Sequence, residues 1–338
     1  MIFKKMLKNL ITINFFIFLI LFSSSSLANS EFELWINDFK KKAISSGISK
    51  IVVEDVMSDA KFLPKVIEYD RYQPEFYEDT KTYISKRTSK KKVKSGIKLF
   101  KQDTEIINKI SKQYNVDVSL LMSLMGIETN FGTYLGKMDI ISSLATLSFD
   151  KRRSEFFTEE LITLLKLVDK KIVDSNTLFG SWAGAFGNFQ FMPSTIKNYA
   201  IDYNKDGSID LKNIEDSFAS ASNYLNLMGW NNKSPCFFEI NLKKNIPEKY
   251  LNTSAKKIKN TEKTLFFLKY IEDSEFLNKY IDLNSAIVTP DIDIVENPNK
   301  FSPAYIVFDN YKLILKWNRS LRFALAVCTL KNKFQNEL

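Results

Sequence analysis

The sequence predicts a mainly α fold with a small β part, in the α+β class. Its 338 residues are 45% hydrophobic and 14% aromatic, which is enough to form large buried cores. Long stretches carry apolar residues at helical spacing with few breakers, whereas residues 234–300 combine Lys, Asn, Asp and Pro with short β-branched runs. The length suggests two or three folding units of about 100 to 200 residues each.

The first 28 residues have the pattern of a secretory signal peptide. Three lysines among the first eight residues precede an apolar core over residues 10–22, and Ser26-Leu27-Ala28 has the small residues of a cleavage site. A transmembrane helix is the alternative, but the apolar run is short of the roughly 20 residues that span a bilayer. We therefore expect an exported, soluble chain without a stable membrane anchor.

Most of the remaining chain predicts helices. Residues 31 to about 114 are amphipathic, with Glu31–Ser45 and Gly96–Tyr114 as the clearest examples. The next helix is expected over Val118–Ile127, with Asn115 or Asp117 as its cap. Further helices are expected over Glu155–Val168, from Met192-Pro193 onward, over residues 218–229 with Gly229 at the end, and over Ser320–Leu330.

Strands are expected only in the last third of the chain. Residues 234–300 predict a small, irregular and partly β insertion. After it, Tyr305–Phe308 and Tyr311–Leu315 resemble a hairpin around Asp309-Asn310.

The composition limits the chemistry that is available. The chain has no histidine, which excludes Ser-His-Asp triads, Cys-His pairs and His-ligated zinc. Acid–base catalysis must therefore use carboxylates, Tyr, Lys or Cys. The two cysteines, Cys236 and Cys328, could form a disulfide, but their presence does not establish one, and Cys328 also suits a core position.

The net charge is +9, and a dense basic run covers Lys86–Lys94. By charge alone the run could bind nucleic acid, but an exported protein rarely meets nucleic acid, so we expect no such partner. A solvated face or loop is the more natural interpretation of the run. An anionic cell-wall polymer is the more natural partner.

The run Gly126–Gly132, with the sequence GIETNFG, is the centre of the prediction. Glu128 continues the apolar helix face that carries Leu121 and Leu124. Burial of a carboxylate there would raise its pKa, which suits a general acid near neutral pH. A helix-end Glu that faces water or meets a core Arg is the alternative. Eight of the ten glycines lie from Gly126 to Gly229, as expected for a segment that carries a site or packs tightly.

Several motifs occur together in a fixed order. They are Gly126–Gly132, Ala145–Phe149, Gly180–Ala185, Gln190–Ser194, and Asn223-Tyr224 followed by Gly229-Trp230. This set resembles lytic murein transglycosylases of the membrane-bound B type, glycoside hydrolase family 103, in the lysozyme-like superfamily. The resemblance covers residues 60–232 clearly and residues 303–328 more faintly.

The resemblance implies a lysozyme-like helical core with flanking helices and a small β part. It also implies cleavage of the β-1,4 bond between N-acetylmuramic acid and N-acetylglucosamine in peptidoglycan. The residue that matches the family's acid is Glu128; it would protonate the leaving oxygen and later act as a base. The muramoyl C6 hydroxyl would attack C1 and leave a 1,6-anhydro end. The chemistry then needs no cofactor and no second carboxylate, although Asp139, Asp150 and Glu155 are near in sequence.

Other residues match positions that line the sugar-binding cleft of the family. Ser181 is expected to orient the acid, and the remaining matches are Gln190, Tyr83, Tyr224 and Asn318. Plain core packing is the alternative for the two tyrosines.

Two residues depart from the family pattern. Trp317 and Phe323 stand where the family tends to have Tyr, so each position keeps a ring and loses a hydroxyl.

Combined with the resemblance, the pattern predicts five segments of the chain. They are a signal peptide (1–28), an N-terminal helical part (29–112), a lysozyme-like core with a calcium-type loop (113–233), a β or irregular insertion (234–300), and a hairpin and helix that complete the core (301–338). The expected location is the periplasm, the partner is the peptidoglycan glycan strand, and the expected state is a monomer.

The segment Asp202–Asp210 has the D-x-N-x-D-G opening of a calcium loop. Its oxygen ligands are expected from Asp202, Asn204, Asp206 and the carbonyl of Ser208. The twelfth position is Asn213, where a Glu normally closes the cage; the resemblance favours a longer loop that Asp216 closes. An Asx-rich turn without metal is the alternative.

Two alternatives to the transglycosylase remain at this point. A hydrolytic muramidase would differ only in using water instead of the C6 hydroxyl. A non-catalytic peptidoglycan-binding protein would keep the fold without the reaction.

Overall fold

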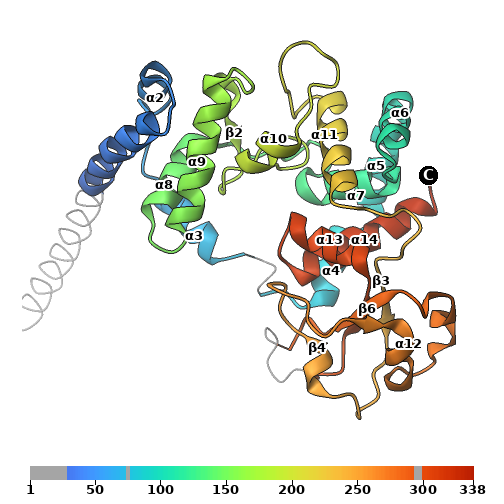
Figure 1. Ribbon diagram of the computed structural model, residues 1–338. Coiled ribbons are helices and arrows are strands. Elements are labelled where there is room, and N and C mark those ends of the chain that lie inside the picture. The colour runs from blue at the N-terminus through green and yellow to red at the C-terminus, as the bar shows by residue number, and fades with distance from the viewer. Residues whose placement is uncertain (1–28, 74–76, 293–298) are drawn as a thin grey trace, which may run out of the picture. The chain divides into compact units, whose positions relative to one another are not determined.

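The computed structural model describes residues 29–73, 77–292 and 299–338, so the predicted signal peptide lies outside the described residues (Figure 1). The chain divides into two compact units that are each discontinuous in sequence. Unit 1 joins the chain up to Asp70 with Lys137–Gly184, and unit 2 joins Arg71–Gly136 with Ala185–Leu338. The five continuous segments expected from the sequence therefore do not coincide with these two units.

Unit 1 is helical. Its elements are a helix over residues 29–45, α2 (Lys50–Val56), α3 (Pro64–Arg71, ending at the boundary), β1 (Met138–Asp139), α8 (Ile140–Phe149), α9 (Ser154–Asp169) and β2 (Phe179–Gly180). The helices α2 and α8 both pack on α9. Rings of Phe32, Phe62 and Phe149 meet with centroids 5.4 to 5.7 Å apart. The short strands β1 and β2 pair antiparallel and hold the ends of the second segment together.

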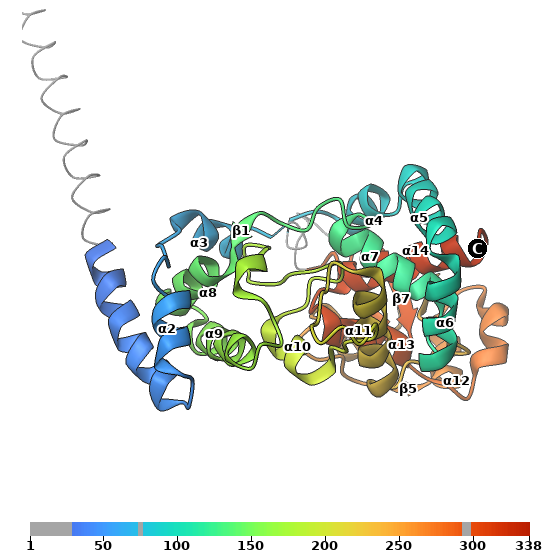
Figure 2. The same ribbon diagram turned by 90° about the horizontal axis from the view of Figure 1, so that it is seen from above.

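Unit 2 contains most of the helices. They are α4 (Thr80–Arg87), α5 (Lys90–Gln102), α6 (Thr104–Tyr114), α7 (Val118–Thr129), α10 (Pro193–Tyr199), α11 (Ile214–Leu227), α12 (Thr264–Phe267), α13 (Asp309–Trp317) and α14 (Leu321–Gln335). α14 packs against α4, α5, α7 and α13, and Figure 2 shows α5, α7 and α14 side by side. α7 is apolar all round and every residue from Ser119 to Gly126 is buried, as expected for a central helix.

The β part of unit 2 is a five-stranded sheet. Its strands are β3 (Phe237–Ile240), β4 (Leu251–Asn252), β5 (Glu262–Lys263), β6 (Asn284–Val288) and β7 (Ala304–Val307). The order is β3-β7-β6-β4, with β5 paired to β6, and only the β4–β6 pair is parallel among the described strands. Buried residues such as Phe267, Ile287 and Phe308 give this part a core of its own. The small β part of the predicted fold class is thus confirmed, whereas the bounds 234–300 stay a prediction, since β7 lies beyond them.

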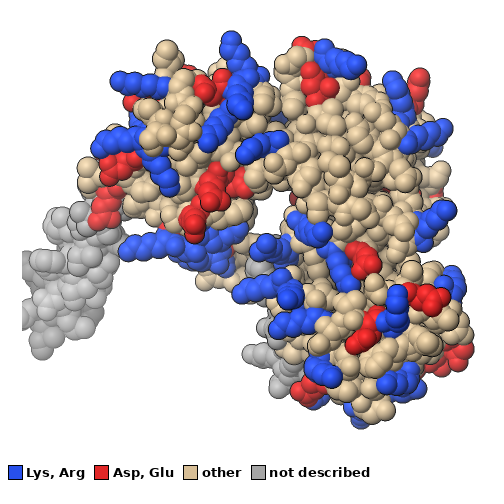
Figure 3. All heavy atoms as spheres, viewed as in Figure 1, with Lys and Arg blue, Asp and Glu red and all other residues tan. Residues whose placement is uncertain are grey.

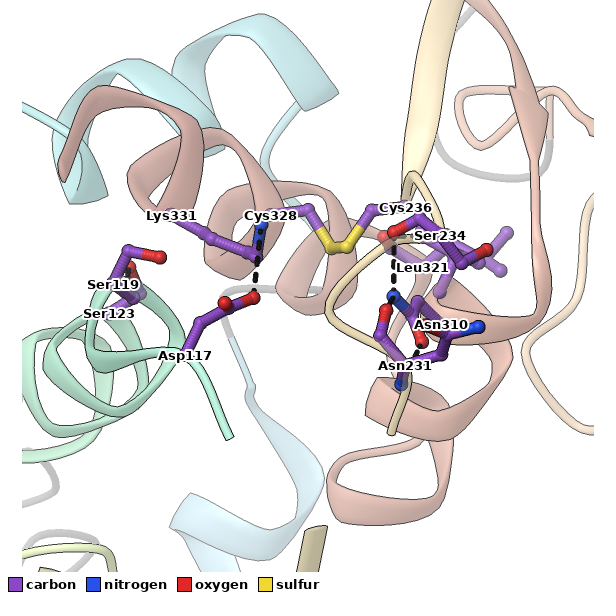
Figure 4. The surroundings of a disulfide bond; sticks show 11 residues. Asp117, Ser119, Ser123, Asn231, Ser234, Cys236, Asn310, Leu321, Cys328 and Lys331 are labelled. Carbon is purple, nitrogen blue, oxygen red and sulfur yellow. Dashed lines mark hydrogen bonds and ion pairs between the residues drawn. A yellow bond between two sulfur atoms is a disulfide. The ribbon is translucent and has the colours of Figure 1, made fainter. Parts of the chain in front are cut away.

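Covalent and ionic links join the parts of unit 2. Cys236, just before β3, forms a disulfide with Cys328 of α14 (Figure 4). Near it, Lys331 of α14 pairs with Asp117 at 3.7 Å. The carboxylate of Asp291, after β6, accepts hydrogen bonds from Arg322 of α14 at 2.6 Å and from the backbone N–H of Thr80 at 3.0 Å. Burying these partners together fixes the β part to α4 and α14.

The predicted hairpin around Asp309-Asn310 is wrong. β7 ends at Val307, and residues from Asp309 onward form α13. The side-chain amide of Asn310 donates to the carbonyls of Asn231 and Ser234, so the residue anchors a helix start and makes no hairpin turn. The partners of β7 are instead β3 and β6. Tyr311, Ile314 and Leu315 are buried at helical spacing, which explains why a helix forms here.

The expected helix over Gly96–Tyr114 is in fact two helices. α5 ends at Gln102 and α6 starts at Thr104, because Asp103 adopts a non-helical conformation between them. Aspartate favours helix ends over helix interiors. The other predicted helices agree with the structure within a few residues.

Candidate active site

Glu128 lies in the last turn of α7 and is half-buried. The helix ends immediately after it because Asn130, Phe131 and Gly132 all have positive φ, at 49°, 60° and 76°. A bulky residue such as Phe131 rarely adopts this conformation, and strain of this kind persists only where packing enforces it.

Two helical glycines provide the packing that holds the turn. A Cβ atom added at Gly126 would lie 2.7 Å from Cζ of Phe131, and one added at Gly96 of α5 would lie 2.8 Å from the same atom. The Phe131 ring therefore fits between α7 and α5, where it also meets Phe334 of α14 edge to face at 6.3 Å. This explains why the GIETNFG motif has glycine at Gly126.

Hydrogen bonds tie the turn to a second motif. The Thr129 hydroxyl donates to the carbonyl of Asn188 at 2.8 Å and accepts the N–H of Gly132 at 3.1 Å. The side-chain amide of Gln190 donates to the carbonyls of Leu135 at 3.2 Å and Gly187 at 2.9 Å. The two segments form one framework around Glu128.

Trp317, the last residue of α13, contacts the candidate acid directly. Its indole N–H donates to Oε1 of Glu128 at 3.0 Å. The Trp317 ring lies 5.1 Å from the ring of Tyr224 and 5.3 Å from that of Phe191, so the donor is fixed in an aromatic cluster. The Tyr224 hydroxyl donates to the carbonyl of Lys316 at 3.3 Å. Burial, and to a lesser extent the neighbouring Tyr199, raise the pKa of Tyr224 to about 12.

A pocket of about 390 Å³ opens at Glu128. It is lined by Ile127, Glu128, Thr129, Asn130 and Tyr134 from α7 and the turn after it, and by Lys86, Ser89, Lys91, Lys92 and Ser95 from α4 and α5. Glu128 is the only carboxylate among the described residues that line this pocket. One carboxylate in a polar pocket can protonate a leaving oxygen, but it lacks the flanking partner of an ordinary glycosidase.

The sequence matches the family described as "Transglycosylase SLT domain" over residues 31–332. The chain belongs to this family. It is also 38% identical to membrane-bound lytic murein transglycosylase B of Escherichia coli K12 over 149 residues. The matched stretch covers 44% of this chain and 41% of that protein. The chain thus matches less than half the length of that relative.

Solved structures of two other proteins have the same fold. SltB3 from Pseudomonas aeruginosa, in complex with NAG-NAM-pentapeptide, matches with a TM-score of 0.77 and 29% identity, over 90% of this chain and 79% of that chain. The Escherichia coli lytic transglycosylase SLT35 in complex with bulgecin A matches with a TM-score of 0.74 and 26% identity, over 89% of this chain and 93% of that chain. A second SLT35 structure, in complex with calcium, matches with a TM-score of 0.73 and 25% identity. The predicted family and lysozyme-like fold class are confirmed.

The site residues that the family resemblance predicts belong to two different units of the chain. Glu128, Gln190, Tyr224 and Asn318 belong to unit 2, whereas Ser181 follows β2 in unit 1. The expected contact of Ser181 with the acid stays a prediction. Asp139, Asp150 and Glu155, the carboxylates near Glu128 in sequence, also belong to unit 1.

Three further positions from the family comparison differ in how exposed their side chains are. Asn318, next to Trp317, is half-buried at the end of α13. Tyr83 is only 3% exposed and carries the Arg87 guanidinium 3.5 Å above its ring, which favours the core-packing alternative for this residue. Phe323 is buried near the start of α14.

The loop after α10 has the shape of an Asx-rich turn. Asp202 accepts the N–H of Gly207 at 2.9 Å, Asn204 that of Asp206 at 3.0 Å, and Asp206 that of Ser208 at 2.9 Å. Asn213 caps α11 through the N–H of Glu215, so it does not close the loop. Among the described residues, no three Asp, Glu, His or Cys side chains gather closely enough for a metal cluster.

Asp216 is the residue that closes this loop. It is fully buried, and its carboxylate accepts the N–H groups of Tyr203 at 2.8 Å and Asp210 at 2.9 Å. Three of the candidate oxygen donors are thus ordered by the loop's own hydrogen bonds, and Asp216 turns toward the loop from α11.

Sequence reasoning missed two features of the site. The first is the hydrogen bond from Trp317: the departure from Tyr loses a hydroxyl, but the indole keeps an N–H donor. The second is the role of the basic run. Lys86 and Lys91 are exposed, as a solvated face predicts, but they also line the pocket with Lys92. The distribution of these side chains depends on packing that sequence spacing does not reveal.

Proposed function

We propose that the protein is a lytic transglycosylase that cleaves the β-1,4 bond between N-acetylmuramic acid and N-acetylglucosamine in peptidoglycan. The observation that carries the proposal is the position of Glu128, held by Trp317 at the mouth of a polar pocket in a chain of the SLT family. The solved relative with NAG-NAM-pentapeptide supports the substrate class.

In the proposed reaction Glu128 acts twice. As the C1–O4 bond breaks, the protonated carboxyl gives its proton to O4 of the departing N-acetylglucosamine. The carboxylate then takes the proton of the muramoyl C6 hydroxyl while O6 bonds to C1. The product is a 1,6-anhydromuramoyl end, no water is consumed, and Glu128 regains its proton.

The donor from Trp317 assigns the two oxygens of Glu128 different roles. An indole N–H can donate a hydrogen bond but cannot accept one. The oxygen Oε1 is therefore an acceptor in both protonation states, and the transferable proton belongs on Oε2. The aromatic cluster around Trp317 would keep this orientation during both steps.

Other predicted side chains would hold the sugar rings. Asn318 follows Trp317 in sequence, and the ring of Tyr224 contacts the ring of Trp317 in the aromatic cluster. Half-buried polar and aromatic groups such as these suit the edges and faces of sugars. Gln190 uses its amide N–H groups on backbone carbonyls, which leaves its amide oxygen as the atom for substrate. Ser181 and Tyr83 are proposed only on the family match.

The proposal extends to the location of the protein and to a structural ion. The predicted signal peptide supports a periplasmic location, and a monomer stays the expected state. None of the described helices combines the length and apolar character that a bilayer-spanning segment needs. The oxygens that would bind calcium come from Asp202, Asn204, Asp206, Ser208 and Asp216. Hydrogen bonds of the loop already order several of these residues, and the ion would draw their oxygens together. The calcium complex of SLT35 supports this part of the proposal.

The deciding experiment is mass spectrometry of the fragments that the protein releases from purified murein sacculi. We expect 1,6-anhydromuramoyl ends. Reducing muramic acid ends as the main product would instead establish a hydrolytic muramidase. No release at all, together with binding to sacculi, would establish a non-catalytic binding protein.

A further inference from the structure

We infer that the lysine-lined side of the pocket at Glu128 binds the carboxylates of the muramoyl peptide stem, so that the protein prefers peptide-bearing glycan to bare glycan. This inference rests on the proposed function and names the part of the substrate that the basic run recognises. Figure 3 shows basic side chains gathered over the part of unit 2 where α4 lies.

The basic side of the pocket comes from α4 and the first turn of α5. Lys86, Lys91 and Lys92 line it together with Ser89 and Ser95, and Glu128 is the only carboxylate among the described residues that line the pocket. The pocket therefore carries an excess of positive charge whether Glu128 is protonated or not. Such a pocket concentrates anions.

The three lysines are fixed to different degrees. Lys92 is half-buried and its ammonium donates to the carbonyl of Gly126 at 2.6 Å. That carbonyl is one of the last four of α7, which lack helical partners, so Lys92 also satisfies the negative end of the helix. Burial, followed by the charge of Arg87, lowers the pKa of Lys92. The backbone of α7 thus holds Lys92 in the lining of the pocket that contains Glu128.

Lys86 and Lys91 are the more accessible cations. Lys86 pairs with Glu78 at 2.6 Å, and Glu78 does not line the pocket. Lys91 forms no ion pair with any residue that the structure describes. Because an ammonium has three N–H donors, each of the three lysines keeps donors for a ligand.

The chemistry of murein identifies the anion. The sugar rings of the strand are neutral, and the lactyl carboxyl of N-acetylmuramic acid is used in the amide bond to the stem. The stem itself carries free carboxylates. The ring that is cleaved at C1 beside Glu128 is the ring that bears the stem at C3, so the stem must leave the glycan close to this pocket. Cation–carboxylate hydrogen bonds are then the natural recognition.

The test compares two substrates and three variants. Each protein is assayed on sacculi and on the same glycan after an amidase has removed the stems. Lys91→Glu is expected to lower kcat/KM on the stem-bearing substrate by about tenfold more than on bare glycan, and Lys91→Gln by about two- to fivefold more, in line with exposed ion pairs. The matched control is Lys94→Glu, which makes the same charge change on α5 outside the pocket and should leave both rates unchanged.

A binding measurement separates this inference from the proposed function. Calorimetry of the Glu128→Gln variant with NAG-NAM-pentapeptide, with and without amidation of the stem carboxylates, reports stem binding without turnover. We expect amidation, or added salt, to weaken binding. If wild-type protein cleaves both substrates equally and amidation has no effect, the inference is wrong while the proposed function stands. If wild-type protein cleaves neither substrate, the proposed function fails first.

Discussion

The indole N–H of Trp317 and Oε1 of Glu128, 189 positions apart in the chain, form a hydrogen bond of 3.0 Å. Glu128 lies in the last turn of α7 and Trp317 is the last residue of α13, so the bond joins the ends of the two helices at the candidate acid. The position of the carboxyl group is thereby set by a rigid aromatic side chain. The consequences can be tested one residue at a time.

Replacing Glu128 by Gln should abolish murein cleavage without unfolding the protein. The amide is nearly the same size but cannot give up a proton in the reaction, and general acid–base catalysis is worth about 100- to 10,000-fold. Release of soluble muropeptides is the assay, and circular dichroism is the control for folding. A folded variant with near wild-type turnover would exclude Glu128 as the acid.

Replacing Trp317 by Phe should lower kcat by about ten- to a hundredfold. A hydrogen bond to a charged group is worth about 1.5–3 kcal/mol, and the ring packing on Tyr224 and Phe191 is largely kept. Because the lost donor favoured the carboxylate form, the alkaline limb of the pH–rate profile should move to higher pH.

The conservative variant separates positioning from packing at this residue. Trp317→Tyr restores a hydroxyl donor and should recover part of the rate and of the wild-type pH profile. A uniform loss in both variants, with no change in the pH profile, would show that Trp317 only packs.

Replacing Gly126 by Ala should destabilise the protein by about 1–3 kcal/mol, the usual cost of overpacking a core. The new methyl group would lie 2.7 Å from Cζ of Phe131, whose ring has no room to withdraw between α5 and α7. Urea denaturation measures the loss, with Lys98→Ala on the exposed face of α5 as the control. If Phe131→Leu in the same chain relieves the loss, the ring is confirmed as the cause.

The sequence predicted the central helix and its acid because α7 is an uninterrupted apolar run that ends in the GIETNFG motif. It failed at Asp309-Asn310, where the same residue types can start a helix or turn a hairpin, and where Asn310 is held by the distant turn at Asn231. The contact of Trp317 with Glu128 was equally out of reach, since it depends on how α13 meets α7. Local patterns gave the elements, and long-range packing decided what meets at the site.

Removing the disulfide should reduce stability by about 2–5 kcal/mol, the typical cost of losing a native bridge. The bond between Cys236 and Cys328 closes a loop of 92 positions and ties the β part to α14 (Figure 4). The Cys236→Ser, Cys328→Ser double variant should unfold at lower urea concentration than the oxidised wild type. Reducing agent should lower the midpoint of the wild type and leave the double variant unaffected; equal midpoints for all would contradict the bridge.

Calcium should raise the melting temperature of the protein if the loop at Asp202–Asp210 binds the ion. Binding to the native state alone stabilises it by an amount that grows with free ion concentration, about 2.7 kcal/mol at 100 times Kd. Asp216→Ala is a poor test because this buried carboxylate also accepts the N–H groups of Tyr203 and Asp210, so its loss costs stability without calcium. Asp206→Asn is the better variant: Asp206 is exposed, and the amide keeps an oxygen while removing one negative charge.

In chelator the Asp206→Asn variant should melt close to the wild type, and in excess calcium it should gain much less than the wild type gains. Magnesium, which demands a near-ideal octahedron, should give little rise in either protein. The matched control is Asp309→Asn, another exposed carboxylate near a helix start, which should keep the full calcium response. A wild-type melting temperature that is the same in calcium and in chelator would leave the loop as an Asx turn stabilised by its own hydrogen bonds.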